Sequence, residues 1–176
     1  CPISEAIEKY PDLVKKYCGI SFVDFYSTDK VETFTINDNY TSTITMSESP
    51  LVTVDTVKER PDYGSPYVTL TTGNYEYYVD VESDAVVRTN ESGNPISWKK
   101  GVGSVQITYN AGYSTCPSDL KLALFDLVNY YMKDEHKERR SLGNAQMSNQ
   151  GTSGIKSSTD FPDHIKRVLD LYRVVI

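Results

Sequence analysis

The sequence is poor in cysteine and has no long hydrophobic run. Its 176 residues include three cysteines, Cys1, Cys18 and Cys116. An odd and small number of cysteines is typical of a reducing compartment and excludes a dense disulfide framework. No stretch approaches the roughly 18 consecutive apolar residues of a membrane-spanning helix, and the mean hydropathy is -0.44. We therefore expect neither a membrane span nor export.

The sequence also lacks the common motifs of catalysis and of metal or cofactor binding. Its two histidines, His136 and His164, have carboxylates near them in the sequence, but neither belongs to an HExxH pattern, and no cysteine pair has zinc-type spacing. Gly101-Val102-Gly103 lacks the third glycine and the following helix of a dinucleotide-binding loop. A GxSxG nucleophile elbow is also missing. We predict that the protein is not an enzyme and binds no metal and no cofactor.

Acidic residues outnumber basic residues by 24 to 18, which gives a net charge of -6. The excess lies in the first part of the chain, because residues 1–98 carry 16 acidic and 7 basic residues, whereas residues 99–176 carry 8 and 11. An acidic surface repels the phosphate backbone of nucleic acids. We therefore expect any DNA-facing surface of this protein to let DNA slide past rather than to bind it.

Tyrosine is the abundant aromatic residue, with 14 Tyr against 5 Phe and 1 Trp. One interpretation is that tyrosine has a high strand propensity and packs well when half-buried. The other is that tyrosine is enriched at protein interfaces, where it offers rigid contact area with a polar tip. Composition alone does not separate the two interpretations.

The sequence pattern of the first part of the chain predicts one helix followed by many short strands. Pro11 suits the first turn of a helix and Gly19 suits its end. From residue 20 to 109 apolar and polar residues alternate with period two, and Gly, Pro and Asn clusters separate the runs. We expect six to eight antiparallel strands, and the clearest are Val31–Ile36, Leu51–Val57, Tyr67–Leu70, Tyr75–Glu82, Ala85–Val87 and Val105–Tyr109.

The last part of the chain changes to helical periodicity. An amphipathic helix is predicted from Pro117 to about Arg140, with Cys116 or Ser118 as its cap. Residues 141–159 are rich in Ser, Gly, Asn, Gln and Thr, which predicts a polar loop that is either disordered or ordered by a partner. A final helix is predicted over Pro162–Arg173. The apolar stripe of the first of these helices consists of Leu120, Leu124, Leu127, Val128 and Tyr131.

Two residues at junctions are expected to shape the backbone. Gly112 lies where a strand must turn sharply towards a helix, and the absence of a side chain permits a positive φ there. Pro162 fixes φ at the start of the final helix.

These patterns predict an α+β fold, a small helical bundle with an inserted antiparallel β-sandwich or small barrel. Residues 1–19 would supply the N-terminal helix of the bundle and residues 20–110 the β insertion. Residues 111–176 would form the C-terminal helical part, including the polar loop at 141–159.

Five short motifs, in their order along the chain, carry a family resemblance. They are Pro50–Val57, Tyr75–Asp80, the strand Val105–Tyr113 that ends in Tyr-Asn-Ala-Gly-Tyr, the helix start Cys116–Ala123 with Pro-Ser-Asp-Leu-Lys, and the closing helix Phe161–Arg173. Together they resemble the head-tail connector, or neck adaptor, proteins of tailed bacteriophages. The last helix departs from that family's pattern, because only one of two expected leucines is present.

The resemblance implies a structural virion protein without catalytic activity. Proteins of this kind form a ring, here most simply a dodecamer, that binds the portal protein at the capsid vertex and extends the DNA channel. DNA passes through without sequence-specific binding, and the far side of the ring binds the next neck or tail-completion protein. The expected location is the neck of the virion, after assembly in the host bacterial cytoplasm, with no membrane partner.

The resemblance also assigns expected partner contacts to particular residues. An apolar, strand-forming tail is costly unless something covers it, and connector proteins dock their C-terminal segment on the portal, which suggests strand addition. The alternative is that the tail, Val174–Ile176, folds back onto its own bundle. The expected portal-binding residues are Tyr172, Arg173, Val174, Val175 and Ile176, and the expected subunit or partner contacts in the loop are Leu142, Met147 and Ile155.

A different class of function is also compatible with the strands. A carbohydrate- or host-surface-binding β module of a phage fibre would use tyrosines and Trp98 to stack on sugars. Such a module has no need for two amphipathic helices at the C-terminal end, so we favour the connector.

Overall fold

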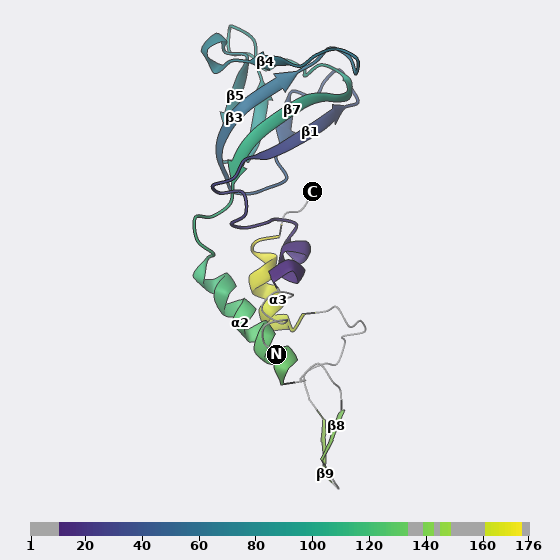
Figure 1. Ribbon diagram of the computed structural model, residues 1–176, viewed down its shortest axis with the longest axis vertical. Helices are drawn as coiled ribbons and strands as arrows, with labels where there is room; N and C mark the ends of the chain where they lie inside the picture. The colour runs from purple at the N-terminus through teal and green to yellow at the C-terminus, as the bar shows by residue number, and fades with distance from the viewer. Residues whose placement is uncertain (1–10, 134–138, 143–144, 149–160, 174–176) are drawn as a thin grey trace. The chain divides into compact units, whose positions relative to one another are not determined.

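The computed structural model describes residues 11–133, 139–142, 145–148 and 161–173 (Figure 1). The chain divides into two compact units. Residues 20–116 form one of them, which we call the β unit. Residues 1–19 and 117–176 form the other, which we call the helical unit.

The β unit contains two antiparallel sheets. The four-stranded sheet has the order β1-β7-β3-β4 (Figure 1), and the three-stranded sheet has the order β2-β6-β5. The predicted α+β class is confirmed, and the described strands form a two-sheet sandwich rather than a closed barrel. The strands are β1 (Lys30–Ile36), β2 (Thr43–Thr45), β3 (Leu51–Glu59), β4 (Val68–Leu70), β5 (Tyr77–Asp80), β6 (Ala85–Arg88) and β7 (Gly101–Ala111), with a 3-10 turn, η1 (Thr72–Asn74), before β5.

The hydrophobic core lies between the two sheets. Val105, Ile107 and Tyr109 of β7 are fully buried, whereas the polar residues between them lie on the outer face, as the period-two pattern predicts. They belong to one cluster with Ile44 and Val86, which come from the other sheet. Full burial of a large apolar side chain contributes about 1.5–3 kcal/mol, so this cluster holds the sheets face to face.

Two details of the strands differ from the sequence predictions. β2 is absent from the predicted strands because three residues are too few to produce a clear alternation. The strand predicted to begin at Tyr75 begins at Tyr77. The turn η1 leaves Tyr75 at φ 55°, a left-handed conformation that does not fit a strand.

Gly112 closes the β unit where the chain leaves it. Its φ is 101°, which confirms the predicted positive φ, and its N–H donates to the carbonyl oxygen of Pro50 at 2.8 Å. On either side of it, Ala111 N–H donates to Phe25 O at 3.0 Å and Tyr113 N–H donates to Phe22 O at 2.7 Å. The segment that enters the β unit and the segment that leaves it are therefore bonded side by side.

A buried carboxylate fixes the entering segment to the sandwich. Glu48 accepts hydrogen bonds from Ser21 N–H at 2.7 Å and from Ser21 Oγ at 3.0 Å. The Lys30 ammonium donates to Glu48 at 2.9 Å and lies 3.0 Å from Glu32. Because Glu48 is almost fully buried, these bonds offset the cost of removing its charge from water.

This cluster predicts a dependence of stability on pH. Burial raises the pKa of Glu32, but the hydrogen bonds from Ser47 and Lys30 outweigh it, so the pKa lies below its ordinary 4.5. A carboxylate with a lowered folded-state pKa stabilises the fold above its unfolded-state pKa, and that stabilisation is lost as the pH falls through the folded-state value. We expect the free energy of unfolding, measured with a denaturant, to decrease as the pH falls below 4.5.

The matched variant Glu32→Gln tests the assignment of this acid dependence. It should cost about 1–2 kcal/mol at neutral pH, because the charged acceptor is removed, and its loss of stability below the ordinary carboxylate pKa should be smaller than in the native sequence. An unchanged slope of stability against pH in this variant would show that Glu32 does not contribute.

The described residues of the helical unit contain three helical segments. Residues 11–18 are helical and Gly19 follows at φ 78°, so the predicted helix end is confirmed. The others are α2 (Ser118–Met132) and α3 (Asp163–Asp170), which pack together. Burial raises the pKa of the Cys18 thiol to about 11, which keeps it protonated and unreactive. Among the described residues of the unit, the buried hydrophobic side chains are Val14, Cys18, Leu120, Ala123, Leu127, Phe161, Ile165 and Leu169.

Both ends of α2 differ from the sequence predictions. The helix ends at Met132 and not near Arg140, because the charged run that follows offers no apolar residue to continue the buried stripe. At its start, Pro117 is the N-cap and no side chain caps the helix. Neither Cys116 nor Ser118 therefore has the predicted capping role.

Part of the predicted polar loop is a β-hairpin. Strand β8 (Arg139–Leu142) pairs antiparallel with β9 (Ala145–Ser148), and Leu142 lies opposite Ala145. The two residues between the strands in the sequence are Gly-Asn, a pair typical of tight hairpin turns. That signal identifies the hairpin, and the prediction of a loop over the whole of 141–159 is wrong in this part.

Candidate docking site of the helical unit

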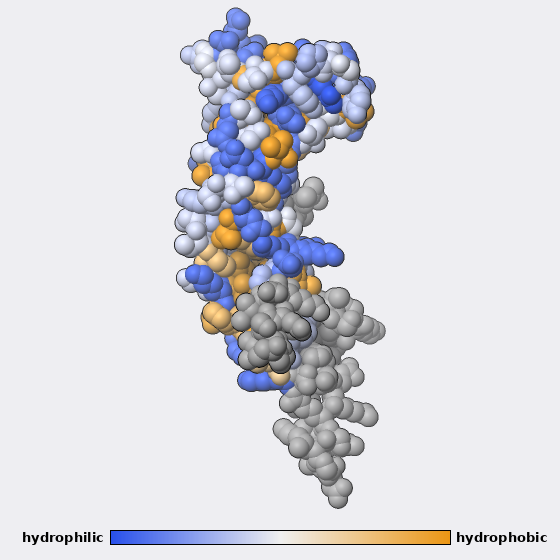
Figure 2. All heavy atoms as spheres, viewed as in Figure 1, coloured by the Kyte–Doolittle hydropathy of each residue, from blue (hydrophilic) through white to orange (hydrophobic). Residues whose placement is uncertain are grey.

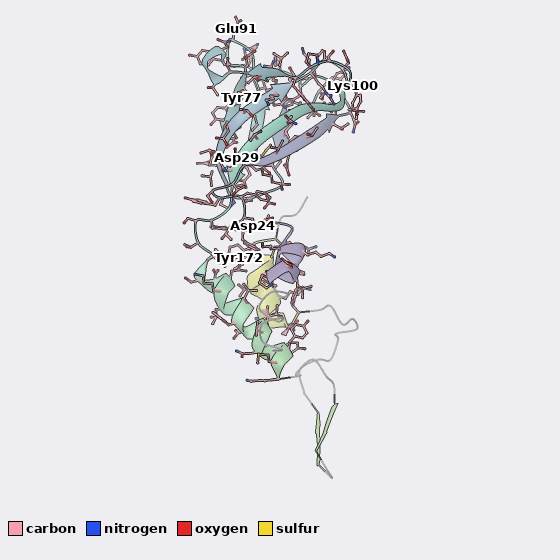
Figure 3. The ribbon with its side chains drawn as sticks, viewed as in Figure 1. Asp24, Asp29, Tyr77, Glu91, Lys100 and Tyr172 are labelled. Carbon is pink, nitrogen blue, oxygen red and sulfur yellow. The ribbon has the colours of Figure 1, made fainter. Side chains whose placement is uncertain are left out.

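Tyr172 joins the chain beyond α3 to the first turn of α2. Its hydroxyl lies 2.7 Å and 2.8 Å from the two carboxylate oxygens of Asp119, to which it donates; Figure 3 labels Tyr172. This hydrogen bond lowers the pKa of Asp119 below its ordinary value. Asp119 also lies in the first helical turn, where a negative charge interacts favourably with the helix dipole.

Arg173 and Asp170 contact the N-terminal helix of the same unit. The Arg173 guanidinium lies 5.5 Å from the centre of the Tyr17 ring, and the Tyr17 hydroxyl donates to Asp170 at 2.6 Å. Burial and the Asp170 carboxylate raise the pKa of Tyr17 to about 12. Residues 170–173 are thereby fixed between the helix at 11–18 and α2.

The predicted portal-binding residues thus have two different outcomes. Tyr172 and Arg173 contact their own helical unit, although Arg173 remains exposed and its positive charge is accessible. Val174, Val175 and Ile176 lie outside the described residues. Whether the tail binds a partner or its own bundle stays a prediction.

An exposed apolar stripe runs along α2. Leu122 is 63% exposed and Phe125 is 67% exposed, and Met132 is exposed on the same face because these positions are separated by three and seven residues. The opposite face of α2 carries the buried residues of the bundle. Hydrophobic side chains are visible on the surface of the helical unit (Figure 2). We call Leu122, Phe125 and Met132 the α2 stripe.

Sequence reasoning missed the α2 stripe. Apolar residues occupy both faces of this helix, so the buried stripe around Leu127 hides the exposed one. Large exposed apolar patches on soluble proteins mark interaction surfaces. The α2 stripe is therefore a candidate interaction surface of the helical unit, separate from the hydrogen bond between Tyr172 and Asp119 in the first turn of α2.

The predicted contacts of the loop fall into one hairpin. Leu142 lies in β8 and Met147 lies in β9, where it is paired with Arg140. Ile155 lies outside the described residues. The structure therefore brings two of the three residues together and leaves their predicted role untested.

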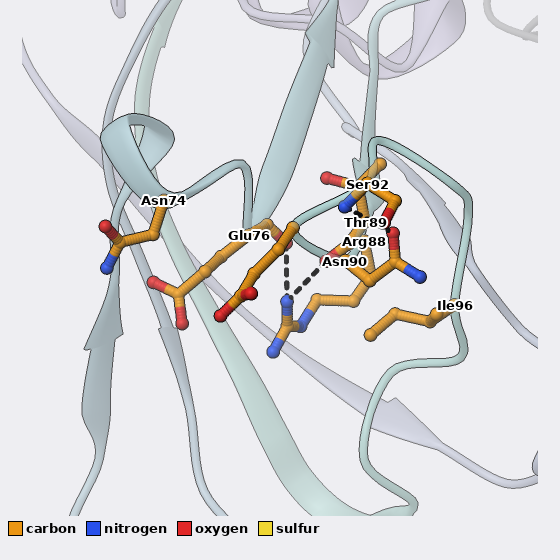
Figure 4. A pocket seen from close by; sticks show the side chains of 8 residues that line it. Asn74, Glu76, Arg88, Thr89, Asn90, Ser92 and Ile96 are labelled. Carbon is orange, nitrogen blue, oxygen red and sulfur yellow. Dashed lines mark hydrogen bonds between the residues drawn. The ribbon is translucent and has the colours of Figure 1, made fainter.

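The β unit has a polar hollow of about 470 Å³ between residues 74–76 and 88–96 (Figure 4). Arg88 Nη1 donates to the carbonyl oxygens of Glu76 at 2.6 Å and Thr89 at 2.9 Å, and its Nη2 lies 3.5 Å from a carboxylate oxygen of Glu59. The guanidinium is thus engaged by groups of the protein. Within the described residues, no three His, Cys, Asp or Glu side chains are arranged to hold a metal ion.

The burial of Trp98 argues against the alternative of a sugar-binding module. Trp98 is 2% exposed and belongs to the core cluster between the sheets. A ring that stacks on a sugar must present one face to solvent, so the proposed role of Trp98 is wrong. Among the described helices, none has the length and apolar character needed to cross a membrane.

Comparison with known proteins identifies relatives of this chain. A family model described as "Head completion protein" matches residues 2–175. The head completion protein of Escherichia phage T5 is 32% identical over 75 residues, which are 42% of this chain and 41% of the phage T5 protein. The alignment therefore spans less than half the length of that relative.

Two solved structures share the fold. A chain from the neck of a native GTA particle, computed with C12 symmetry, superposes with a TM-score of 0.61 at 15% identity and covers 100% of this chain and 84% of that one. A chain from the neck of an empty GTA particle, computed with C6 symmetry, superposes with a TM-score of 0.60 at 16% identity, with coverages of 99% and 79%.

The resemblance predicted from five sequence motifs is confirmed at the level of the family. Because the family match covers nearly the whole sequence, the chain belongs to the head completion protein family.

Proposed function

We propose that this chain is a structural subunit of the neck of a tailed phage. In this role it forms the adaptor ring between the portal vertex and the tail, extends the DNA channel, and offers a docking surface to the next neck or tail-completion protein. The observation that carries the proposal is the family match over residues 2–175. The role is structural and requires no catalysis.

The helical unit supplies the surface proposed for the portal. The α2 stripe leaves large apolar side chains in water, and an assembly protein gains stability when a partner covers them. Tyr172 and Arg173 are of the residue types that dominate interface hot spots. Both are held by Asp119 and Tyr17 before any partner binds, which lowers the entropic cost of docking. The tail Val174–Ile176 would add an extended strand to the portal.

The subunits are proposed to form a ring of twelve that matches the portal. Related folds occur in necks computed with C12 and C6 symmetry, which supports a ring without determining its contacts here. A closed ring of identical subunits with cyclic symmetry needs heterologous contacts, in which two different surfaces of the chain meet. Leu142, Met147 and Ile155 are proposed to contribute to contacts with a neighbouring subunit or partner.

The charge of the β unit supports a channel wall that DNA does not bind. This unit carries 13 acidic and 6 basic residues, a net charge of -7, whereas the helical unit carries 11 and 12. A negative wall repels the phosphate backbone and lets packaged DNA pass. The proposed location is the neck of the virion, with assembly in the host cytoplasm.

The proposal is tested by mixing the protein with the portal of the same phage. We expect native mass spectrometry to detect a complex in which about twelve copies bind one portal. We expect the free chain to be monomeric or weakly associated, because the contacts proposed for the tail and for the loop residues form only with partners. A stable ring without portal would contradict this order of assembly. Absence of any complex with the portal would contradict the proposed function.

A further inference from the structure

Basic residues gather at one end of the acidic β unit. Four of its six basic residues lie where β3 ends and β7 begins: Lys58, Arg60, Lys99 and Lys100. The two chain segments are in contact there, because Arg60 N–H donates to Ser104 O at 2.8 Å and Lys99 N–H donates to Glu59 at 2.7 Å. Glu59 and Asp62 lie in the same segments, so residues 58–62 and 99–100 carry a net charge of +2, whereas the rest of the β unit carries -9.

The side chain of Arg60 holds two exposed residues in place at this end. Its Nε donates to Gly103 O at 2.9 Å, Nη1 to Tyr63 O at 2.9 Å and Nη2 to Val102 O at 3.2 Å. Its guanidinium also lies 4.8 Å from the centre of the Tyr63 ring and 4.7 Å from that of Tyr67. Tyr63 is nevertheless 73% exposed and Val102 is 64% exposed.

These contacts preorganise an interaction surface. All three bonds of Arg60 go to carbonyl oxygens, and the nearby Asp62 carboxylate interacts with its charge only electrostatically. Tyrosine and arginine are enriched in interface hot spots, and a surface already fixed in the free protein loses little entropy on binding. We call Arg60, Tyr63, Lys100 and Val102 the basic end.

The hollow of Figure 4 has the complementary character. Glu76 and Glu91 line it together with Asn74 and Ile96, and the remaining charged residue, Arg88, is engaged by protein carbonyls and by Glu59. We call Asn74, Glu76, Glu91 and Ile96 the acidic hollow. A cavity of about 470 Å³ is within the range of pockets that bind small molecules, so it accommodates an aromatic side chain.

The two surfaces lie on different sides of the β unit. Figure 3 shows Lys100 on one side of the sandwich and Glu91 on the other. Glu59 lies between them, because it accepts from Lys99 N–H at 2.7 Å and lies 3.5 Å from Arg88 Nη2. Two different and complementary surfaces on one chain are what a head-to-tail contact between identical copies requires.

We propose that the basic end of one copy docks into the acidic hollow of the next copy. Tyr63 enters the hollow, Lys100 faces Glu91, and Val102 covers apolar area beside Ile96. The contact is heterologous, so its repetition gives a ring when the rotation between neighbouring copies closes, and the inference rests on the ring assembly proposed above. Complementary charges at such a contact fix which surfaces meet and speed their encounter.

Charge reversal of one pair tests this contact. Lys100 and Glu91 are both exposed, and the charge of Lys100 also acts on the carboxylate of Asp38 in the same copy. At low salt and protein concentrations up to about 1 mM, sedimentation velocity should detect weak self-association of the native chain. Lys100→Glu and Glu91→Lys should each weaken this association by more than about tenfold.

The combined variants make the test specific. The double variant Lys100→Glu/Glu91→Lys keeps the net charge and should regain association to within about threefold of the native chain. An equimolar mixture of the two single variants should also regain association, because copies that alternate place opposite charges at every contact. Lys16→Glu and Glu82→Lys change exposed charges elsewhere and serve as controls that should associate like the native chain.

The possible failures are distinguishable. A native chain that stays strictly monomeric up to that concentration would overturn this contact, whereas a ring that assembles only on the portal would still stand. A native chain that associates while both single reversals leave association unchanged, or while the double variant remains as weak as the single ones, would overturn the contact and leave the proposed ring standing.

Discussion

Replacing Gly112 with alanine is expected to lower the free energy of unfolding by more than about 3 kcal/mol, a large part of the typical total of roughly 5–15 kcal/mol. A Cβ at this position would lie 2.0 Å from the carbonyl oxygen of Phe22 and 3.0 Å from its carbonyl carbon. Both atoms belong to backbone that is bonded to Tyr113, so they cannot move aside without breaking the junction of the β unit. The φ of 101° adds strain for any residue with a side chain.

Two other glycines separate the clash from the strain. Gly19 has φ 78° but no atom within 4 Å of a built Cβ, so Gly19→Ala should cost about 1 kcal/mol through strain alone. Gly73 has neither a positive φ nor a close atom, so Gly73→Ala should change stability by less than about 0.5 kcal/mol. Urea unfolding of the three variants measures the free energy of unfolding of each and so tests the expected order of these stability losses. A Gly112→Ala variant as stable as Gly19→Ala would refute the close packing against Phe22.

Deleting Val174–Ile176 is expected to weaken portal binding by more than about tenfold, equivalent to roughly 1.4 kcal/mol. The tail is a β-branched run suited to strand addition, and it follows directly on residues that are already fixed at the docking site by Asp119 and Tyr17. The fold should survive, because chain ends tolerate truncation unless they are tied down. Thermal unfolding and a portal pull-down on the same truncated protein measure both quantities.

The alternative account predicts the reverse outcome for this truncation. If the tail packs on its own bundle, the melting temperature falls and binding decreases only in proportion to the folded fraction. Val81→Ser, which changes an exposed β-branched residue of the β unit, is a control that should alter neither quantity. A truncated protein that melts normally and binds the portal at full strength would contradict both accounts.

The sequence predicted those parts of the fold that depend on local pattern. The alternation along Val105–Tyr109 places a strand and its buried face correctly, and Gly112 is found because a strand must leave the sandwich there. The end of α2 was not predictable from helix propensity alone. Charged residues such as Lys133 and Glu138 form helices readily, and only the loss of a buried face after Met132 marks the end.

The contacts at the proposed docking site join residues that are far apart in the sequence, so local pattern does not predict them. Tyr172 meets Asp119 across 53 positions of the chain, and no local pattern encodes that pairing. The exposure of Phe125 depends equally on which face of α2 the remaining helices cover. Tyrosine composition also remains ambiguous until the fold is known, because Tyr109 is fully buried whereas Tyr63 is largely exposed, so both interpretations hold in different places.

The central claim is that this chain forms the ring between portal and tail, and imaging the neck of the intact particle tests it most directly. Cryo-electron microscopy of the purified phage should resolve, next to the portal, a ring of about twelve copies into which the β unit and the helical unit each fit. Density for this chain in a tail fibre, or a neck whose portal-proximal ring is built from a different fold, would contradict it.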